Sequence, residues 1–194
     1  GKIENRIKII KDQSIGNKKW DTGNSNNWAR PATLNTELNT TYLNSLDSTA
    51  KSMIGNTKYY LGGYSNSKIQ KDVMYQYERK TNGSIPNSWV GKLAIMYASD
   101  YGYAVSDECT QNLYNYNNAT CKNNNWLFKG IDEWTLLRFA SISYGVFGVG
   151  SGGYVSSYGV SDNPYGVRPV LYLISSAKIT GGNGTSSSPY TLGL

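Results

Sequence analysis

The order of apolar and polar positions predicts helices in the first quarter of the chain and short strands after it. Residues 6–11, RIKIIK, alternate well enough to predict a first strand. A helix is predicted to begin just after Pro31. The apolar positions that follow have the spacing of one helical face, namely Leu34, Leu38, Tyr42 and Leu46.

A second, shorter helix is predicted directly after the first. Its capping candidates are Ser45, Asp47 and Ser48. Its apolar face consists of Ala50, Met53 and Ile54. The pair Gly55-Asn56 is expected to end it, because both residues tolerate the backbone conformation that closes helices.

Beyond residue 56 the helical period disappears and short β-like segments replace it. These segments are 58–61, 92–97, 126–128, 134–137, 144–149, 154–160 and 167–173. Pro169 has no amide donor, so its strand must start there or run along an edge. The stretches 62–91 and 99–125 are predicted to be irregular, and such long connections usually carry function or their own order.

Together these elements predict an α+β chain with two helices near the N-terminus, small twisted antiparallel sheets and long ordered loops. The length of 194 residues favours a single domain over 1–194, with residues 1–4 and 193–194 as linker ends. The tail 181–194, GGNGTSSSPYTLGL, is expected to be a turn-rich linker or a closing segment.

The segment 134–173 has apolar ends and a middle rich in tyrosine, serine and glycine. The apolar ends, expected to be core strands, are Trp134, Leu136, Leu137, Val170, Leu171, Tyr172 and Leu173. The middle has the composition of a recognition surface, since tyrosine gives large contact area and serine and glycine give adaptable hydrogen bonds. The predicted ligand-binding residues are Arg138, Phe139, Ser141, Ser143, Tyr144, Phe147, Ser151, Tyr154, Ser156, Tyr158 and Tyr165.

A plain structural explanation of the same segment is a twisted hairpin with Ser151-Gly152-Gly153 as its turn. A turn needs only one or two glycines and does not require so many tyrosines. Trp20 and Trp28 have a similar double interpretation, as binding residues or as lids on a core, and the core is favoured for large aromatic residues.

Composition narrows the classes of function. Aromatic residues make up 13% of the chain and charged residues only 16%, which leaves enough apolar area to order a fold. The net charge is +6, but apart from a modest N-terminal run the lysines are scattered, so we expect no nucleic-acid partner. No run of about 18 apolar residues is present, and the opening GKIENRIKII is typical of a trimmed fragment. We therefore expect membrane attachment only through an anchor outside this chain.

The chain contains no histidine, which removes the commonest general base and the commonest transition-metal ligand. We expect no catalysis, no cofactor and no bound metal. The turn Asp162-Asn163-Pro164 is only a weak calcium motif, so binding is expected to be independent of calcium. Cys109 and Cys121 lack CxxC spacing, and we predict that they form a structural disulfide; the alternative, in a reducing compartment, is two free core thiols.

Several sequence blocks give the chain a resemblance to a known fold. The blocks are YYLGGY (59–64), SDYGYA (99–104), CKNNNWL (121–127), EWTL (133–136), YGVRPVLYL (165–173) and ITGGNGTSSSPYTL (179–192). They resemble blocks in secreted or pilin-anchored surface proteins of gut Firmicutes that have a C-type-lectin-like fold. The resemblance spans most of the chain and implies an extracellular, cell-surface attached protein.

Gly166-Val167-Arg168 resembles the terminal GFR block of formylglycine-generating-enzyme relatives, a branch of that fold that includes variable proteins of diversity-generating retroelements. The resemblance implies that Arg168 is a framework residue, buried against carboxylate or carbonyl partners such as Asp132 or Glu133, and the alternative is an exposed arginine. Trp134, at the apolar front of the segment 134–173, is also expected to be a framework residue. The RGGSW-type block of those relatives is missing, and residues 137–141 stand in its place. The diversified surface of such proteins would correspond to positions 138–165.

Three functions follow from these observations. The favoured one is a non-catalytic adhesin or receptor-binding domain for a protein or glycan ligand on another cell or surface. The first alternative is the structural head domain of a pilin-like fibre, which would contact neighbouring subunits. The second is an oxidase of the formylglycine-generating type, but its copper-holding cysteine pair near the C-terminus has no counterpart, since Cys109 and Cys121 lie well before the GVR block.

Overall fold

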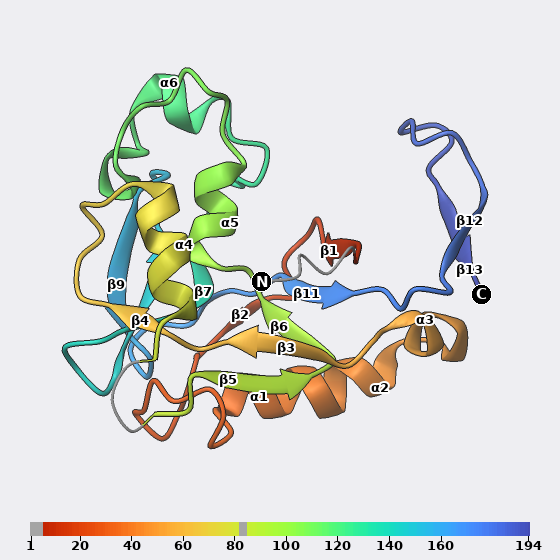
Figure 1. The fold of residues 1–194 in the computed structure, drawn as a ribbon, viewed down its shortest axis with the longest axis horizontal. Helices are drawn as coiled ribbons and strands as arrows, with labels where there is room; N and C mark the ends of the chain where they lie inside the picture. Colours follow the sequence, from red (N-terminus) through yellow and green to blue (C-terminus); the bar gives the residue numbers. More distant parts are fainter. Residues whose placement is uncertain (1–5, 82–84) are drawn as a thin grey trace.

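The computed structural model describes residues 6–81 and 85–194, and it shows an α+β chain with few short helices and several small antiparallel sheets (Figure 1). The helices are α1 (Thr33–Glu37), the π-helical η1 (Leu38–Tyr42), α2 (Leu43–Ser45), α3 (Ser48–Met53), α4 (Lys71–Arg79), α5 (Ala98–Tyr103), the 3-10 turn η2 (Leu113–Asn115) and α6 (Ala119–Lys122). The strands are β1 (Lys8–Ile10), β2 (Asn17–Lys18), β3 (Thr57–Tyr60), β4 (Gly63–Tyr64), β5 (Ser88–Gly91), β6 (Leu93–Ile95), β7 (Glu133–Phe139), β8 (Gly145–Val149), β9 (Val155–Gly159), β10 (Tyr165–Gly166), β11 (Pro169–Tyr172), β12 (Lys178–Gly181) and β13 (Thr191–Gly193).

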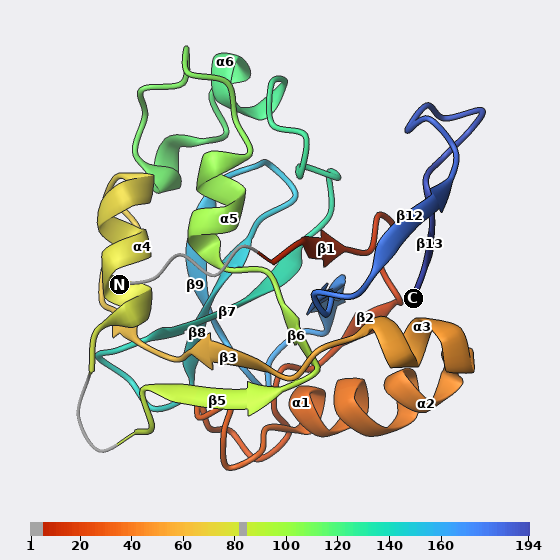
Figure 2. The ribbon, with the colours of Figure 1, turned by 45° about the vertical axis from the view of Figure 1, so that its right-hand side comes forward.

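The two N-terminal helices are confirmed. Segments α1, η1 and α2 follow one another without a break, and in Figure 2 they run along the lower right of the molecule from the end of β5, with α3 above α2. Leu34 and Leu38 from the predicted apolar face are fully buried. Asp47 caps α3, because its carboxylate accepts a hydrogen bond of 2.8 Å from the backbone amide of Ala50.

Two sheets organise the centre of the molecule. The first has the order β1-β11-β6, and its central strand begins at Pro169, as expected for a residue without an amide donor. The second has the order β2-β10-β7-β8-β9, with β4 paired to β7. β3 and β5 form a separate antiparallel pair.

The stretches predicted to be irregular contain much of the remaining helix. Residues 62–91 include α4, and 99–125 include α5 and α6. The inward side of α4 combines apolar residues such as Met74 with the fully buried carboxylic acid Glu78, and a search for apolar spacing alone did not predict this helix. The strand expected at 126–128 is instead a turn, in which the side chain of Asn125 accepts a 3.0 Å hydrogen bond from the amide of Leu127.

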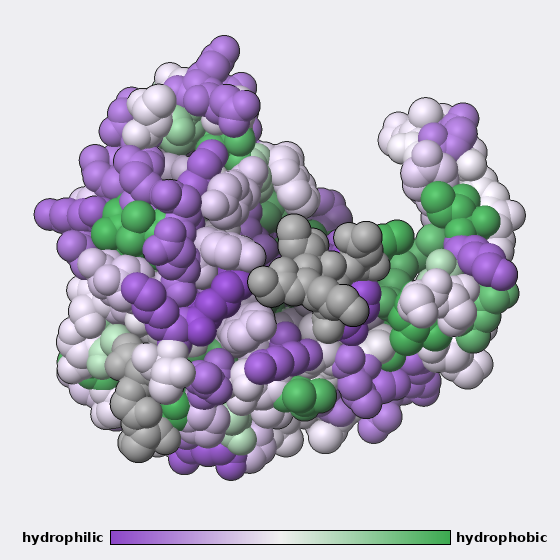
Figure 3. All heavy atoms as spheres, in the orientation of Figure 1, coloured by the Kyte–Doolittle hydropathy of each residue, from purple (hydrophilic) through white to green (hydrophobic). Residues whose placement is uncertain are grey.

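The tail is also more ordered than a linker. β12 and β13 pair as an antiparallel hairpin that stands apart from the rest of the molecule (Figures 1 and 3). Gly193, expected to be a linker end, pairs with Lys178 in this hairpin. Residues 1–4, the other expected linker end, lie outside the described residues.

The core consists of two apolar clusters. One contains Trp20, Trp28 and Trp134, and the other contains Met74, Phe147 and residues around the disulfide. Trp20 and Trp28 are 0% and 1% exposed, so the interpretation of both as core residues is confirmed. Trp20 also donates a 3.1 Å hydrogen bond from Nε1 to the backbone oxygen of Thr135, which ties the N-terminal loop to β7.

Candidate functional site

The middle of the segment 134–173 forms a β-hairpin, as its glycines suggested. β8 and β9 are paired from Gly145 opposite Gly159 to Val149 opposite Val155. The turn lies at residues 151–153, where Gly153 has a φ of 98° and donates a 2.8 Å hydrogen bond to the backbone oxygen of Gly150. The hairpin therefore accounts for the turn glycines, and the tyrosines need a separate explanation.

Two tyrosine rings, those of Tyr154 and Tyr158, pack directly on the backbone of Gly150 and Gly148. A Cβ atom on Gly150 would meet the Tyr154 ring at 2.6 Å, and one on Gly148 would meet the Tyr158 ring at 3.1 Å. Side chains at these positions would displace the rings, so glycine lets each ring pack directly on the backbone. The glycines and tyrosines thus work as pairs across the hairpin.

The Tyr158 ring belongs to a cluster of aromatic rings that also includes Trp134 of β7 and Tyr165 of β10. The ring centroids of Tyr158 and Tyr165 are 5.0 Å apart at an interplanar angle of 89°, and those of Trp134 and Tyr165 are 4.5 Å apart. Trp134 is buried and donates a 2.6 Å hydrogen bond from Nε1 to the backbone oxygen of Lys18. Tyr154, Tyr158 and Tyr165 remain partly exposed, and we call these three residues the tyrosine face.

The hydroxyl groups of Tyr158 and Tyr165 stay protonated at neutral pH, because their surroundings raise the pKa of both. Burial, followed by interactions with the Tyr154 hydroxyl, raises the pKa of Tyr158. Burial and the negative charge of Asp132 raise the pKa of Tyr165. Asp132 also accepts a 2.7 Å hydrogen bond from the amide of Ser151, so this carboxylate is fixed at the hairpin turn.

Phe147 and Arg138 do not lie on this face. Phe147 is 0% exposed and packs against Phe139 with a centroid distance of 5.5 Å. Arg138 is 7% exposed and packs against Gly63, where a Cβ atom would come within 2.7 Å of its Cγ. Both were predicted to contact ligand, and burial removes them from that set. The cause is that both faces of these strands are covered: every residue of β8, which carries Phe147, is buried, and so is every residue of β7, which carries Arg138, except its last.

The remaining predicted ligand residues fall into two groups. Ser141, Ser143 and Tyr144 are exposed in the turn that joins β7 to β8, whereas Ser151 is exposed in the turn at the other end of β8. Phe139 and Ser156 are partly exposed. The sequence therefore predicted one continuous surface, and the structure separates it into a β7–β8 turn and the tyrosine face.

The β7–β8 turn is held by a residue that the sequence did not single out. The buried Asn26 donates from Nδ2 to the backbone oxygens of Phe139, Ile142 and Gly145, at 3.1, 2.7 and 2.8 Å. Its own amide donates to the backbone oxygen of Ser143 at 2.7 Å. The sequence could not single out Asn26 among the asparagines of its loop, because the backbone oxygens that it binds are more than 110 residues away in sequence.

The predicted burial of Arg168 against a carboxylate is confirmed. Arg168 is 3% exposed and binds both carboxylate oxygens of Glu133, at 2.6 Å and 2.9 Å, and the backbone oxygen of Leu127 at 2.7 Å. Burial raises the pKa of Glu133, and the hydrogen bond from Arg168 opposes that rise. The pair of Arg168 and Glu133 links the residue just before β11 to the first residue of β7.

Cys109 and Cys121 form a disulfide, so the interpretation as two free thiols is wrong. The bond links the segment after α5 to α6, and both cysteines are buried in the second core cluster. A structural disulfide indicates an oxidising, non-cytoplasmic compartment. Because both sulfur atoms are used in this bond, neither is available as a thiolate ligand for copper.

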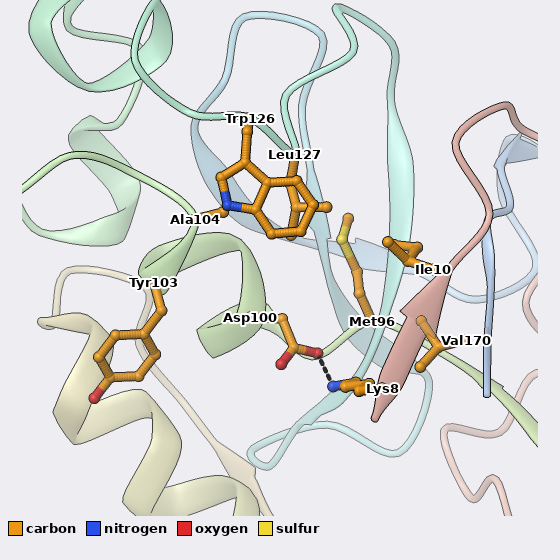
Figure 4. Close-up of a pocket in the computed structure, with 9 residues that line it drawn as sticks. All are labelled: Lys8, Ile10, Met96, Asp100, Tyr103, Ala104, Trp126, Leu127 and Val170. Carbon is orange, nitrogen blue, oxygen red and sulfur yellow. Dashed lines mark hydrogen bonds and ion pairs between the residues drawn. The ribbon is translucent and has the colours of Figure 1, made fainter. Parts of the chain in front are cut away.

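A pocket of about 290 Å³ lies away from the tyrosine face and was not predicted (Figure 4). It is lined by Lys8, Ile10, Met96, Asp100, Tyr103, Ala104, Trp126, Leu127 and Val170. Trp126 was assigned to a strand, but its side chain is 68% exposed at the rim of this pocket. Only tertiary structure brings β1, α5 and the turn at Trp126 together, so local spacing carried no signal for it.

Within residues 6–81 and 85–194, no group of three or more potential metal-ligating side chains of the histidine, cysteine, aspartate or glutamate type comes together. In the same ranges, no helix has the length and apolar character needed to cross a bilayer. Comparison with known proteins gave no matching family, no matching curated protein and no matching solved structure. The resemblance to C-type-lectin-like proteins therefore remains a prediction.

Proposed function

We propose that this protein is a non-catalytic, extracellular ligand-binding domain with a C-type-lectin-like fold, and that the tyrosine face contacts the ligand. The observation that carries the proposal is the seating of Tyr154 and Tyr158 on Gly150 and Gly148, with Tyr165 beside them. Three partly exposed rings are thereby held in fixed positions before any ligand arrives. Such preorganisation lowers the entropic cost of binding.

The chemistry of the tyrosine face suits a protein surface or a glycan. The hydroxyl groups of Tyr154 and Tyr165 can donate and accept hydrogen bonds, while the Tyr158 hydroxyl is buried and the three rings supply apolar contact area. Asp132, fixed by the Ser151 amide, adds an acceptor beside the rings. The exposed Ser141, Ser143 and Tyr144 of the β7–β8 turn would extend the contact toward the other end of the hairpin.

The proposed lectin-like fold is supported by the order of its elements. Two helices come first, small antiparallel sheets follow, and β1 pairs with β11 so that the beginning of the chain meets its late framework segment. The disulfide supports a role outside the cell, where we place the protein on the surface through an anchor beyond this chain. Recognition is proposed to be independent of calcium and of nucleic acid.

The proposal is tested by arrays of printed glycans and of extracellular protein domains. The labelled protein is applied in parallel with the variant Tyr154→Ser/Tyr165→Ser and with Tyr190→Ser, a control at an exposed tyrosine of the tail hairpin. We expect a bound ligand for the wild type and the control, and at least about a tenfold loss for the double variant. Equal binding by all three proteins would assign recognition to another surface.

A second candidate function, the head of a surface fibre, is favoured by the tail hairpin. Ile179 and Tyr190 on the hairpin are 59% and 55% exposed, and Leu192 lines an apolar groove of about 210 Å³ together with Ile9 and Leu46. Hydrophobic residues also gather on and below the hairpin in Figure 3. Sedimentation of the full chain and of a variant lacking 178–194 tests this function, which requires self-association that is lost on deletion.

A further inference from the structure

We propose that the pocket beside Trp126 is a second binding site, and that it takes a single neutral sugar ring. This inference goes beyond the proposed function of the tyrosine face, because the two sites share no residue. The proposal rests on three properties of this pocket: the exposed indole of Trp126, an ion pair with no net charge between Lys8 and Asp100, and a small volume. Each of these properties restricts the chemistry of the occupant.

The apolar floor of the pocket comes from alternation in the sheet β1-β11-β6. Lys8 and Ile10 of β1 and Val170 of β11 line this pocket, whereas Ile9 and Leu171 line the groove on the other side of the sheet. Met96, directly after β6, completes the floor. Figure 4 shows these side chains converging below the indole of Trp126. The floor is therefore as rigid as the sheet that supplies it.

The backbone of Trp126 is anchored on both sides of its exposed ring. Its amide donates a 3.2 Å hydrogen bond to the backbone oxygen of Ala104. The preceding Asn125 is buried and donates from Nδ2 to the backbone oxygen of Tyr101 at 2.8 Å. The backbone under the indole is thereby anchored, and a ring at 68% exposure offers apolar area that a ligand with an apolar face can cover. The faces of pyranose rings have this character, because their C–H groups gather on one side.

The polar group opposite Trp126 is an ion pair between Lys8 and Asp100. Asp100 is oriented by a 2.8 Å hydrogen bond from the amide of Tyr97, and the Lys8 ammonium lies 5.0 Å from the Tyr97 ring centroid. The two side chains are 26% and 28% exposed, so a ligand can reach both. Adjacent hydroxyl groups match such a pair, since one donates to the carboxylate while the other accepts from the ammonium.

Charge and size narrow the occupant further. Lys8 and Asp100 are the two charged residues among the described lining residues, and their charges cancel, so the pocket favours a neutral ligand over an ion. The volume of about 290 Å³ lies at the lower end of the range for small-molecule sites. A single ring fits this volume, and a longer chain would have to extend past the rim at Tyr103.

Tryptophan fluorescence offers a direct test, because Trp126 is 68% exposed, whereas Trp20, Trp28 and Trp134 are at most 2% exposed and Trp89 is only partly exposed. The full chain is titrated with methyl glycosides of glucose, galactose, mannose and N-acetylglucosamine. At least one of them is expected to give a saturable emission change and to protect the indole from acrylamide quenching. A methyl hexuronide serves as the charged comparison and is expected to bind more weakly.

Variants examined by calorimetry separate this site from the rest of the surface. Trp126→Ala and Lys8→Met are each expected to weaken binding by about tenfold or more, since one removes the stacking wall and the other a charged donor. Tyr190→Ala, the exposed aromatic control, should bind as the wild type does. The proposal is overturned if none of the neutral glycosides binds, if both pocket variants keep full affinity, or if the hexuronide binds best.

Discussion

At the scale of single residues, the stability of the fold depends most clearly on buried charged side chains that must be paired. Arg168 and Glu133 form a bidentate pair with exposed fractions of 3% and 2%. The requirement for a buried arginine followed from resemblance, and Glu133 was one of two carboxylates considered. The choice between Asp132 and Glu133 needed the alternation of β7, which turns Glu133 inward, while Asp132, just before the strand, binds the hairpin turn.

Replacement of Arg168 by methionine should lower the free energy of unfolding by about 3–5 kcal/mol, because it leaves the Glu133 carboxylate buried without its partner. Urea unfolding followed by circular dichroism measures this loss. The double variant Arg168→Met/Glu133→Leu should recover part of it, since no buried charge then remains. Lys129→Met, which removes an ion pair with the exposed Asp12, should change nothing measurable. Purely additive losses in the double variant would contradict this explanation.

Glu78 makes stability depend on pH. Complete burial raises its pKa from an ordinary 4.5 to about 7, against the lowering effect of two hydrogen bonds from Ser99. Between these values the folded protein keeps a proton that the unfolded chain releases. Stability is therefore highest at low pH with respect to this group, and it falls by about 3 kcal/mol as the pH rises from 4.5 to 7.

The Glu78 effect is measured as the difference between wild type and Glu78→Gln in urea unfolding at pH 5 and pH 7.5. The variant should lack this part of the pH dependence, because its amide does not titrate. Glu37→Gln, at a partly exposed ion pair with Lys18, should retain it. Identical pH profiles for the wild type and Glu78→Gln would show that Glu78 titrates normally in the folded protein.

At the scale of elements, local signals succeeded where the chain repeats a simple period. The apolar spacing from Leu34 onward, the cap at Asp47 and the glycine turn near Gly153 were all visible in sequence. Local signals did not predict α4, whose buried side includes Glu78. They also predicted a strand at Trp126, where the structure has a turn with an exposed tryptophan side chain. In both cases tertiary partners decide the outcome, and propensity does not.

The disulfide should stabilise the segment between α5 and β7 mainly by restricting the unfolded chain. Cys109 and Cys121 are 12 residues apart, which corresponds to about 3 kcal/mol in the loop-closure account. Cys109→Ala/Cys121→Ala is expected to lose stability of this order in urea unfolding. Addition of dithiothreitol should lower the stability of the wild type similarly and leave the variant unchanged. A variant as stable as the oxidised wild type would contradict this role.

At the scale of the whole molecule, the sequence predicted the α+β class and the late framework but not the arrangement of the candidate site. The predicted surface at 138–165 assumed that nearby residues share a face. Instead, Phe147 is buried in the hairpin, and the two turns lie at opposite ends of β8. The rings of Trp134, Tyr158 and Tyr165 come together from three different strands. Such long-range assembly depends on strand order, which no local pattern contains.

The most direct test of the central claim is the affinity of a ligand identified on the arrays for the wild type and for Tyr154→Ser/Tyr165→Ser, measured by calorimetry with unfolding midpoints recorded for both. The account predicts a loss of at least about tenfold in affinity at a temperature well below both unfolding midpoints; the midpoint of the variant is expected to be lower, because Tyr165 packs against the buried Trp134. Undiminished affinity in the double variant would contradict it.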